Sequence, residues 1–60
     1  MQSMTPADFR AWRKRLGLTQ AQAAESLGRS AAWVRKAEAG AIPIHTVVAL
    51  ACRMIEMDRQ

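Results

Sequence analysis

The spacing of apolar residues predicts a helix near the start of the chain. Phe9, Trp12 and Leu16 recur three and four residues apart, so they share one face of a helix that continues up to Gly17. Residues 5–8 suit a helix start, because the threonine can cap it, the proline fits the first turn and the aspartate meets the helix dipole. We expect the apolar face to pack inward, with Trp12 mainly in the core.

Two short helices joined by a tight turn are predicted next. The first covers roughly residues 20–27, and Ala24 sits where a bulky side chain would hold the two helices apart. Thr19 can cap this helix, with Gln22 as its reciprocal partner three residues on. Gly28 can take the positive φ that ends a helix.

The second of these helices covers roughly residues 31–39 and stops at Gly40. Ser30 can cap it, and Val34 and Ala37 give it an inward stripe. A helix–turn–helix of this size can present its second helix to the DNA major groove. The pattern therefore indicates a duplex-binding surface on the outer side of residues 31–39.

A last helix is expected from about Ile44 to Met57, with Pro43 in its first turn. One apolar stripe along it can cover the core: Ile44, Val47, Val48, Ala51 and Ile55. A second, offset stripe would stay in water in a monomer: Val47, Leu50, Met54 and Met57. Contiguous exposed apolar surface usually marks an interaction site, so we expect the second stripe to form a homodimer interface. The alternative is that both stripes are buried against the first and third helices.

Length and composition favour a single all-α domain. We assign residues 1–4 to a flexible tail and residues 5–60 to one domain, because no strand pattern, repeat or low-complexity segment interrupts the 60 residues. A chain this short buries only about 60% of its unfolded surface, so association often stabilises it. Alanine dominates the apolar residues, which predicts a thin core made of close helix contacts.

The single cysteine bears on the compartment. Cys52 excludes an internal disulfide and suits a reducing cytosol, and its apolar helical surroundings favour a small buried side chain over a reactive thiol. No apolar run is long enough to span a bilayer, and no signal-peptide pattern opens the chain. We therefore expect a cytoplasmic protein without a membrane partner.

Positive charge is concentrated in one part of the chain, whose formal net charge is +4. The window from Arg10 to Lys36 contains seven bases and one acid, Glu25. A basic region beside a more acidic last helix suggests a face built for a polyanion. Charge alone would favour nucleic acid only weakly; on a helix–turn–helix scaffold it favours it strongly.

Catalytic and metal chemistry have little support in the sequence. There is no nucleophile–base pair, no glycine-rich phosphate loop and no carboxylate pair that a cleft could use. His45 is the only histidine, and neither a second histidine nor a cysteine stands at ligand spacing from it. We expect a protein that is not an enzyme and has no cofactor or metal.

The central residues resemble the Cro/CI-type (XRE-like) helix–turn–helix regulators of phages and bacteria. The resemblance covers Phe9 to about Ile55, and it rests on Leu18-Thr19-Gln20, Ala24, Leu27-Gly28, Ser30, Val34 and Glu38-x-Gly40. It implies a compact, lambda-repressor-like bundle of four or five helices that binds operators as a symmetric dimer. The small scale and apolar last helix are similar to those of compact phage and anti-CRISPR-associated repressors.

The resemblance also implies roles for individual residues. Gln20 matches a family glutamine that binds a DNA phosphate, and Arg13 and Glu38 match a structural ion pair. The positions expected to face base edges are Arg35, Ala31 and Ala32. Arg35 is the best candidate base reader, because a planar guanidinium matches guanine O6 and N7.

Further contacts to the DNA backbone are expected on both sides of the base-reading positions. The residues concerned are Lys36, Trp33, Arg29, Ser30 and His45. Trp33 can place its ring against a sugar and its N–H on a phosphate, or it can pack between the two central helices. Arg29 replaces a common aliphatic residue of the family and is expected to point outward. His45, in the first turn of the last helix, either contacts phosphate or is merely exposed.

These observations predict a sequence-specific, double-stranded-DNA-binding transcriptional regulator, most simply a repressor that binds an inverted-repeat operator as a homodimer. Its half-sites would lie one helical turn, ~10 bp, apart. No small-molecule effector domain is expected. The alternative is a protein-interaction module, such as the DNA-binding half of an antitoxin or a co-regulator, whose last helix binds a different protein.

Overall fold

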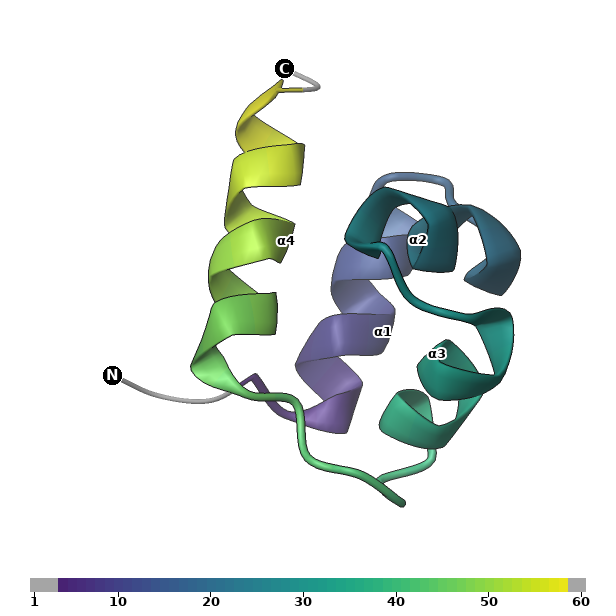
Figure 1. Ribbon diagram of the computed structural model, residues 1–60. Coiled ribbons are helices and arrows are strands. Elements are labelled where there is room, and N and C mark those ends of the chain that lie inside the picture. Colours follow the sequence, from purple (N-terminus) through teal and green to yellow (C-terminus); the bar gives the residue numbers. More distant parts are fainter. Residues whose placement is uncertain (1–3, 59–60) are drawn as a thin grey trace.

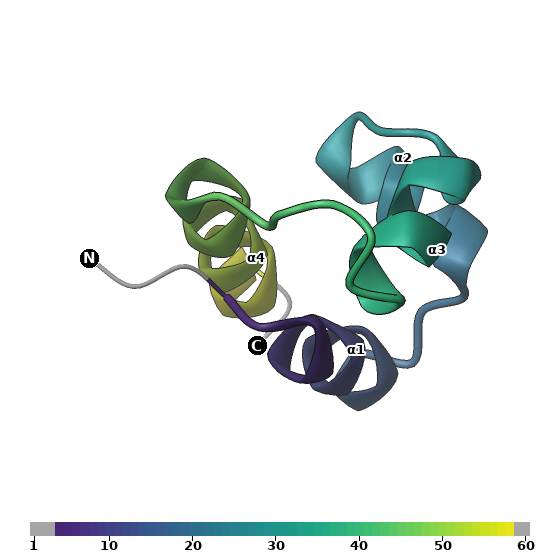
Figure 2. The ribbon, with the colours of Figure 1, turned by 90° about the horizontal axis from the view of Figure 1, so that it is seen from below.

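The computed structural model describes residues 4–58 and shows the expected all-α fold in that span. Its helices are α1 (Pro6–Arg15), α2 (Gln20–Leu27), α3 (Ala31–Glu38) and α4 (Thr46–Asp58). α2 and α3 lie together on one side and α4 stands on the other (Figure 1), with α1 packed against α3 and α2 in contact with α4. From below, the segment 39–45 runs from the end of α3, beside the start of α1 at Pro6, across to α4 (Figure 2).

Reciprocal caps fix the starts of α1 and α2. The Thr19 hydroxyl accepts the Gln22 backbone N–H at 3.1 Å, and the Gln22 side chain accepts the Thr19 N–H at 2.9 Å, which confirms the predicted capping box. Thr5 and Asp8 form the same arrangement at the start of α1. Asp8 therefore bonds directly to the cap, in addition to meeting the helix dipole as predicted.

The turn between α2 and α3 follows from Gly28 and Ser30. Gly28 has φ +68°, a left-handed conformation that an alanine would adopt only with strain, and its N–H caps the end of α2. The Ser30 hydroxyl then accepts the Trp33 backbone N–H at 3.1 Å and starts α3. α3 ends at Glu38 and Ala39 is its cap, one residue earlier than predicted.

α4 begins at Thr46 rather than at about Ile44, so the prediction that Pro43 lies in its first turn is wrong. Ile44 is only 3% exposed and belongs to the core, which holds the preceding segment in a non-helical path. The His45 carbonyl accepts the backbone N–H of Val48 at 2.9 Å. His45 therefore sits at the entrance of the helix and not in its first turn.

All four helices contribute to one small core. The fully buried side chains include Trp12 and Phe9, whose rings stack with centroids 5.6 Å apart. The complete core is Phe9, Trp12, Ala23, Ala24, Val34, Ala37, Ile44, Val48 and Cys52. Three of the nine residues are alanines, as expected for a thin core in which helices approach closely.

Cys52 is buried, as predicted. Burial, with a smaller contribution from the negative charge of Glu56, raises the pKa of its thiol to about 11. The thiol therefore stays protonated near neutral pH, where it is a poor nucleophile.

Two predictions for the edges of the core need correction. Met4 was assigned to the flexible tail, but it is partly buried and packs against the core, because its unbranched side chain can fill an irregular gap. Residues 1–3, the rest of that predicted tail, lie outside the described residues. Val47 was placed in both apolar stripes of the last helix, but it is 75% exposed and belongs only to the outer one.

Candidate nucleic-acid interface

The outer side of α3 is free. Val34 and Ala37 face the core, whereas Ala32, Arg35 and Lys36 are exposed on the opposite side of the helix. The core fixes which side of α3 faces inward. With 3.6 residues per turn, the exposed residues then lie on the outer side. A partner can therefore approach this side of α3 without displacing any of residues 4–58. Ala31 lies at the margin of this face and is half-buried.

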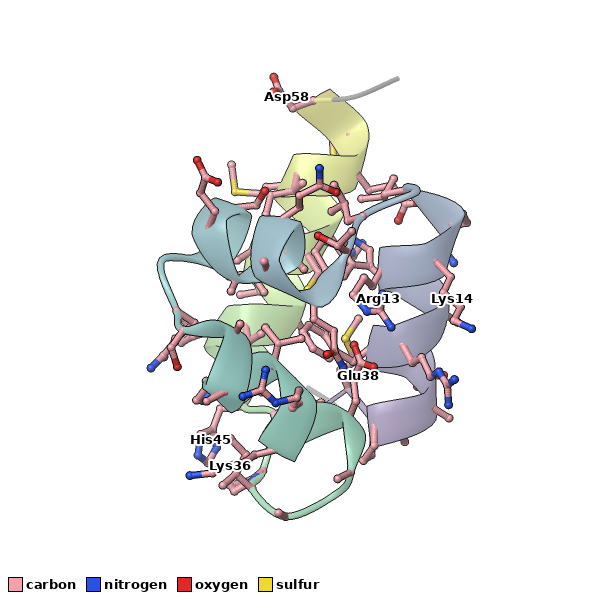
Figure 3. The ribbon with its side chains drawn as sticks, turned by 90° about the vertical axis from the view of Figure 1, so that its right-hand side faces the viewer. Arg13, Lys14, Lys36, Glu38, His45 and Asp58 are labelled. Atoms are coloured by element: carbon pink, nitrogen blue, oxygen red, sulfur yellow. The ribbon has the colours of Figure 1, made fainter. Side chains whose placement is uncertain are left out.

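An ion pair fixes one edge of α3 to α1. Both side chains are largely buried: Arg13 is 13% and Glu38 8% exposed, and the Arg13 Nη2 donates to Glu38 Oε1 at 3.1 Å while Nε donates to Oε2. Arg13 also donates to the Leu18 carbonyl at 3.0 Å. Figure 3 shows the two side chains pointing toward each other between the helices. The pair therefore sets the position of α3 relative to α1 and to the chain entering α2.

The pKa of Glu38 is lowered from its ordinary value. Burial alone would raise it, but the hydrogen bond and charge of Arg13 together with smaller effects of Gln20 and Arg10 outweigh that burial. Glu38 therefore stays ionised, and Arg13 keeps a charged partner.

Gln20 lies at the start of α2 and is linked to the same ion pair. Its amide nitrogen donates to Glu38 Oε1 at 3.4 Å, and the residue is half-buried. The Gln20 side chain is thus held at the edge of α3. Its amide nitrogen has two N–H donors, so one can stay on Glu38 while the other reaches a second acceptor.

A shallow groove runs along the opposite edge of α3, toward the start of α4. Its walls carry Arg29, Trp33 and His45, and its remaining lining is apolar: Ile42, Pro43, Val47 and Val48. The Trp33 ring is half-buried and meets Phe9 of α1 edge-on, with ring centroids 5.9 Å apart. Arg29 lies over the Trp33 ring, its guanidinium carbon 5.1 Å from the ring centroid.

Basic side chains stand on both sides of α3. In Figure 3, Lys36 and His45 lie to the left of α3, and Lys14 of α1 lies to its right. All three are exposed. Within residues 4–58 the carboxylates that form ion pairs engage Arg13 and Arg15, so Arg29, Arg35 and Lys36 keep their charges for another partner.

Arg15, whose side chain is 55% exposed, forms an ion pair with α4. Its Nε and Nη2 donate to Glu56 of α4 at 2.7 and 2.9 Å, which connects the end of α1 to α4. Hydrogen bonding to Arg15 lowers the pKa of Glu56. The contact spans 41 residues, and neither residue stands in a local pattern that would have paired them.

The domain also exposes the second apolar stripe of α4. Val47, Met54 and Met57 are 75%, 71% and 72% exposed, and Leu50 is 42% exposed. The alternative that both stripes are buried within one copy of the chain is therefore wrong. The inner stripe alone packs on the core, because α4 contacts the other helices along only one side.

Among the residues the structure describes, no three histidine, cysteine or acidic side chains come together in a group that could hold a metal ion. None of the described helices is long and apolar enough to cross a membrane.

The fold and the free face of α3 agree with a comparison of the sequence with known families. Residues 7–60 match the family described as helix-turn-helix domain. The chain belongs to this family. The unit that gives the family its name is α2, the turn at 28–30 and α3, and the match extends over α1 and α4 as well. No curated protein and no solved structure matches the chain.

The sequence did not reveal how the expected contact residues of this helix-turn-helix domain are held. Gln20 was identified without its bond to Glu38, and Arg29 and Trp33 were identified separately rather than as a stacked pair. Arg29 lies in the turn before α3 and not on the helix, so the rule that residues four apart meet on a helical surface does not apply to it, and no local pattern paired it with Trp33.

Proposed function

We propose that this helix-turn-helix domain is a sequence-specific, double-stranded-DNA-binding transcriptional regulator that places α3 in the major groove. One observation carries the proposal: the outer side of α3 is exposed and holds two cations, Arg35 and Lys36, that no described carboxylate neutralises. A polyanion is the partner that such a surface favours, and a single helix fits the width of the groove.

Base recognition is assigned to Arg35 with Ala31 and Ala32. Arg35 projects from the exposed side of α3 and can donate two parallel hydrogen bonds to guanine O6 and N7. Ala32 is exposed beside it, and its methyl group can contact a thymine methyl. Ala31 is half-buried, so its small side chain chiefly lets the helix backbone come close to the base edges.

Contacts to the DNA backbone are assigned to both edges of α3. Gln20 can keep one N–H on Glu38 and offer the other to a phosphate, since an amide has two donors. On the opposite edge the candidates are Arg29, Ser30, Trp33, Lys36 and His45. Contacts on both edges would fix the register of α3 in the groove without reading sequence themselves.

Pairing of two copies through the outer stripe of α4 would complete the site. A two-fold dimer reads an inverted repeat, with half-sites about one turn, ~10 bp, apart. Four exposed apolar residues along one helix support such a contact. A dimer that covers an operator in this way would act most simply as a repressor.

Selection of bound sequences from a pool of random duplexes tests the proposal. We expect enrichment of a two-fold symmetric motif whose half-sites are one turn apart. An Arg35→Ala/Lys36→Ala double variant run in parallel should bind more weakly and lose the preference at one base pair of each half-site, whereas Arg53→Gln, which removes a charge from exposed α4 surface, should enrich the wild-type motif. Failure of the wild-type domain to enrich any duplex sequence would overturn the proposal.

A further inference from the structure

Arg29 and Trp33 form a pair in the groove between α3 and the start of α4. Arg29 is an exposed residue of the turn before α3, and its guanidinium carbon lies 5.1 Å from the centroid of the Trp33 ring. A distance of that size over the face of an indole gives an attractive cation–π contact. A long, solvent-exposed arginine side chain that is held at one place has lost much of its conformational freedom before any ligand arrives.

The Trp33 ring also contacts the core. It meets Phe9 edge-on at 5.9 Å, and Phe9 stacks on Trp12 at 5.6 Å in the centre of the core. The indole thus contacts both the buried Phe9 and the exposed Arg29. This arrangement connects the position of Arg29, through Trp33, to the fully buried rings of Phe9 and Trp12.

The guanidinium over the Trp33 ring remains able to bind an anion. The ring attracts its positive charge, and a guanidinium has five N–H donors with which it can also bind an anion. Within residues 4–58 the ion pairs are Arg13–Glu38 and Arg15–Glu56, so those N–H groups have no carboxylate partner. His45 lies in the same groove and adds a second polar donor beside Arg29.

We propose that Trp33 is a positioning residue: it holds Arg29 ready for a phosphate of the bound duplex and acts on DNA affinity through Arg29. The proposal rests on the DNA-binding function proposed above and corrects one part of it, because Trp33 then needs no DNA contact of its own. A pre-ordered cation binds more tightly than a free one, since less conformational entropy is lost on binding.

A double-mutant cycle on the selected duplex tests the proposal. We expect Arg29→Gln to weaken binding about tenfold and to lower the slope of log K against log salt by about 0.9, the value for one lost phosphate contact. Trp33→Leu, which keeps an apolar side chain on the core, should also weaken binding, by less than Arg29→Gln. In the Arg29→Gln background, Trp33→Leu should cause no further loss, and Trp33→Phe in the wild-type background should restore most of the affinity.

Two outcomes would overturn the proposal while the DNA-binding function stands. The first is an equal loss from Trp33→Leu in both backgrounds, which would make Trp33 a direct contact or a purely structural residue. The second is unchanged affinity and salt slope in Arg29→Gln. Failure of the wild-type domain to bind any duplex would overturn both proposals, and Arg53→Gln controls for the loss of one positive charge elsewhere.

Folding of each variant is checked by circular dichroism and thermal unfolding before binding is measured. If Trp33→Leu does not fold, the cycle is run with Trp33→Phe, whose ring keeps an aromatic face. Its smaller loss of affinity should likewise vanish in the Arg29→Gln background. A loss that persists there would contradict the positioning role.

Discussion

Trp12 donates its indole N–H to the backbone carbonyl of Cys52 at 2.9 Å, across 40 residues of sequence. Both residues are buried, and the bond joins α1 to the middle of α4. Cys52 therefore matters for its backbone as much as for its small side chain. The bond gives the thin core a directional contact that apolar packing alone cannot provide.

Replacing Trp12 by phenylalanine should lower the free energy of unfolding by about 1–3 kcal/mol, because a buried hydrogen bond is lost and the smaller ring leaves space. Urea unfolding followed by circular dichroism measures the change. Cys52→Ala keeps the carbonyl acceptor and serves as the comparison, since it removes only the sulfur. Equal stability of Trp12→Phe and the wild type would show that this bond contributes nothing.

The Glu38–Arg13 ion pair predicts a loss of stability in acid. The pKa of Glu38 is lower in the folded chain than its ordinary value of 4.5, so the unfolded chain binds that proton more tightly. The contribution of the pair is therefore fully present above pH 4.5 and is lost as the pH falls through the lower, folded pKa. Thermal unfolding between pH 2 and pH 7 should show this loss.

A Glu38→Gln variant should be less stable at pH 7 by about 1–3 kcal/mol, because Arg13 loses its charged partner in a largely buried site. It should also lose less stability in acid than the wild type. Glu25→Gln, at an exposed position of α2, provides a matched change of charge. Identical acid profiles for Glu38→Gln and the wild type would contradict this assignment.

The parts of the fold that the sequence predicted well depend on neighbouring residues. The ends of α2 were found because Thr19, Gln22 and Gly28 act within one or two turns of chain. The inner side of α3 was found because Val34 and Ala37 are spaced for one helical face. The free outer side of α3 follows from the same periodicity.

The parts that the sequence missed depend on contacts between distant segments. Burial of Ile44 delays the start of α4, and Arg15 pairs with Glu56 only because the ends of α1 and α4 come together. No local pattern contains that information. The edge-on contact of Trp33 with Phe9 likewise needs the position of α1, so the two possible placements of Trp33 stayed open at the level of sequence.

Arg35 should determine one base position of the operator. We expect Arg35→Ala to cost about 1–3 kcal/mol of binding free energy and to relax the preference at a single base pair in each half-site. Titration of a set of duplexes, each with one changed base pair, separates this effect from a general loss. Lys36→Ala is the matched control, since loss of a phosphate contact should weaken binding to all the duplexes alike. A uniform loss for Arg35→Ala would make it a backbone contact instead.

The outer stripe of α4 should hold two copies of the domain together. A charge placed in the centre of an apolar interface is strongly unfavourable, so a Leu50→Glu/Met54→Lys variant should sediment as a monomer where the wild type sediments as a dimer. Both positions are exposed in a single copy, at 42% and 71%, so folding should change little and circular dichroism should stay the same.

The monomeric variant should also bind an isolated half-site as the wild type does but lose tight binding to the full operator, because the second half-site no longer adds to affinity. A wild-type domain that stays monomeric both free and on the operator would exclude the homodimer and favour a different protein as the partner of α4.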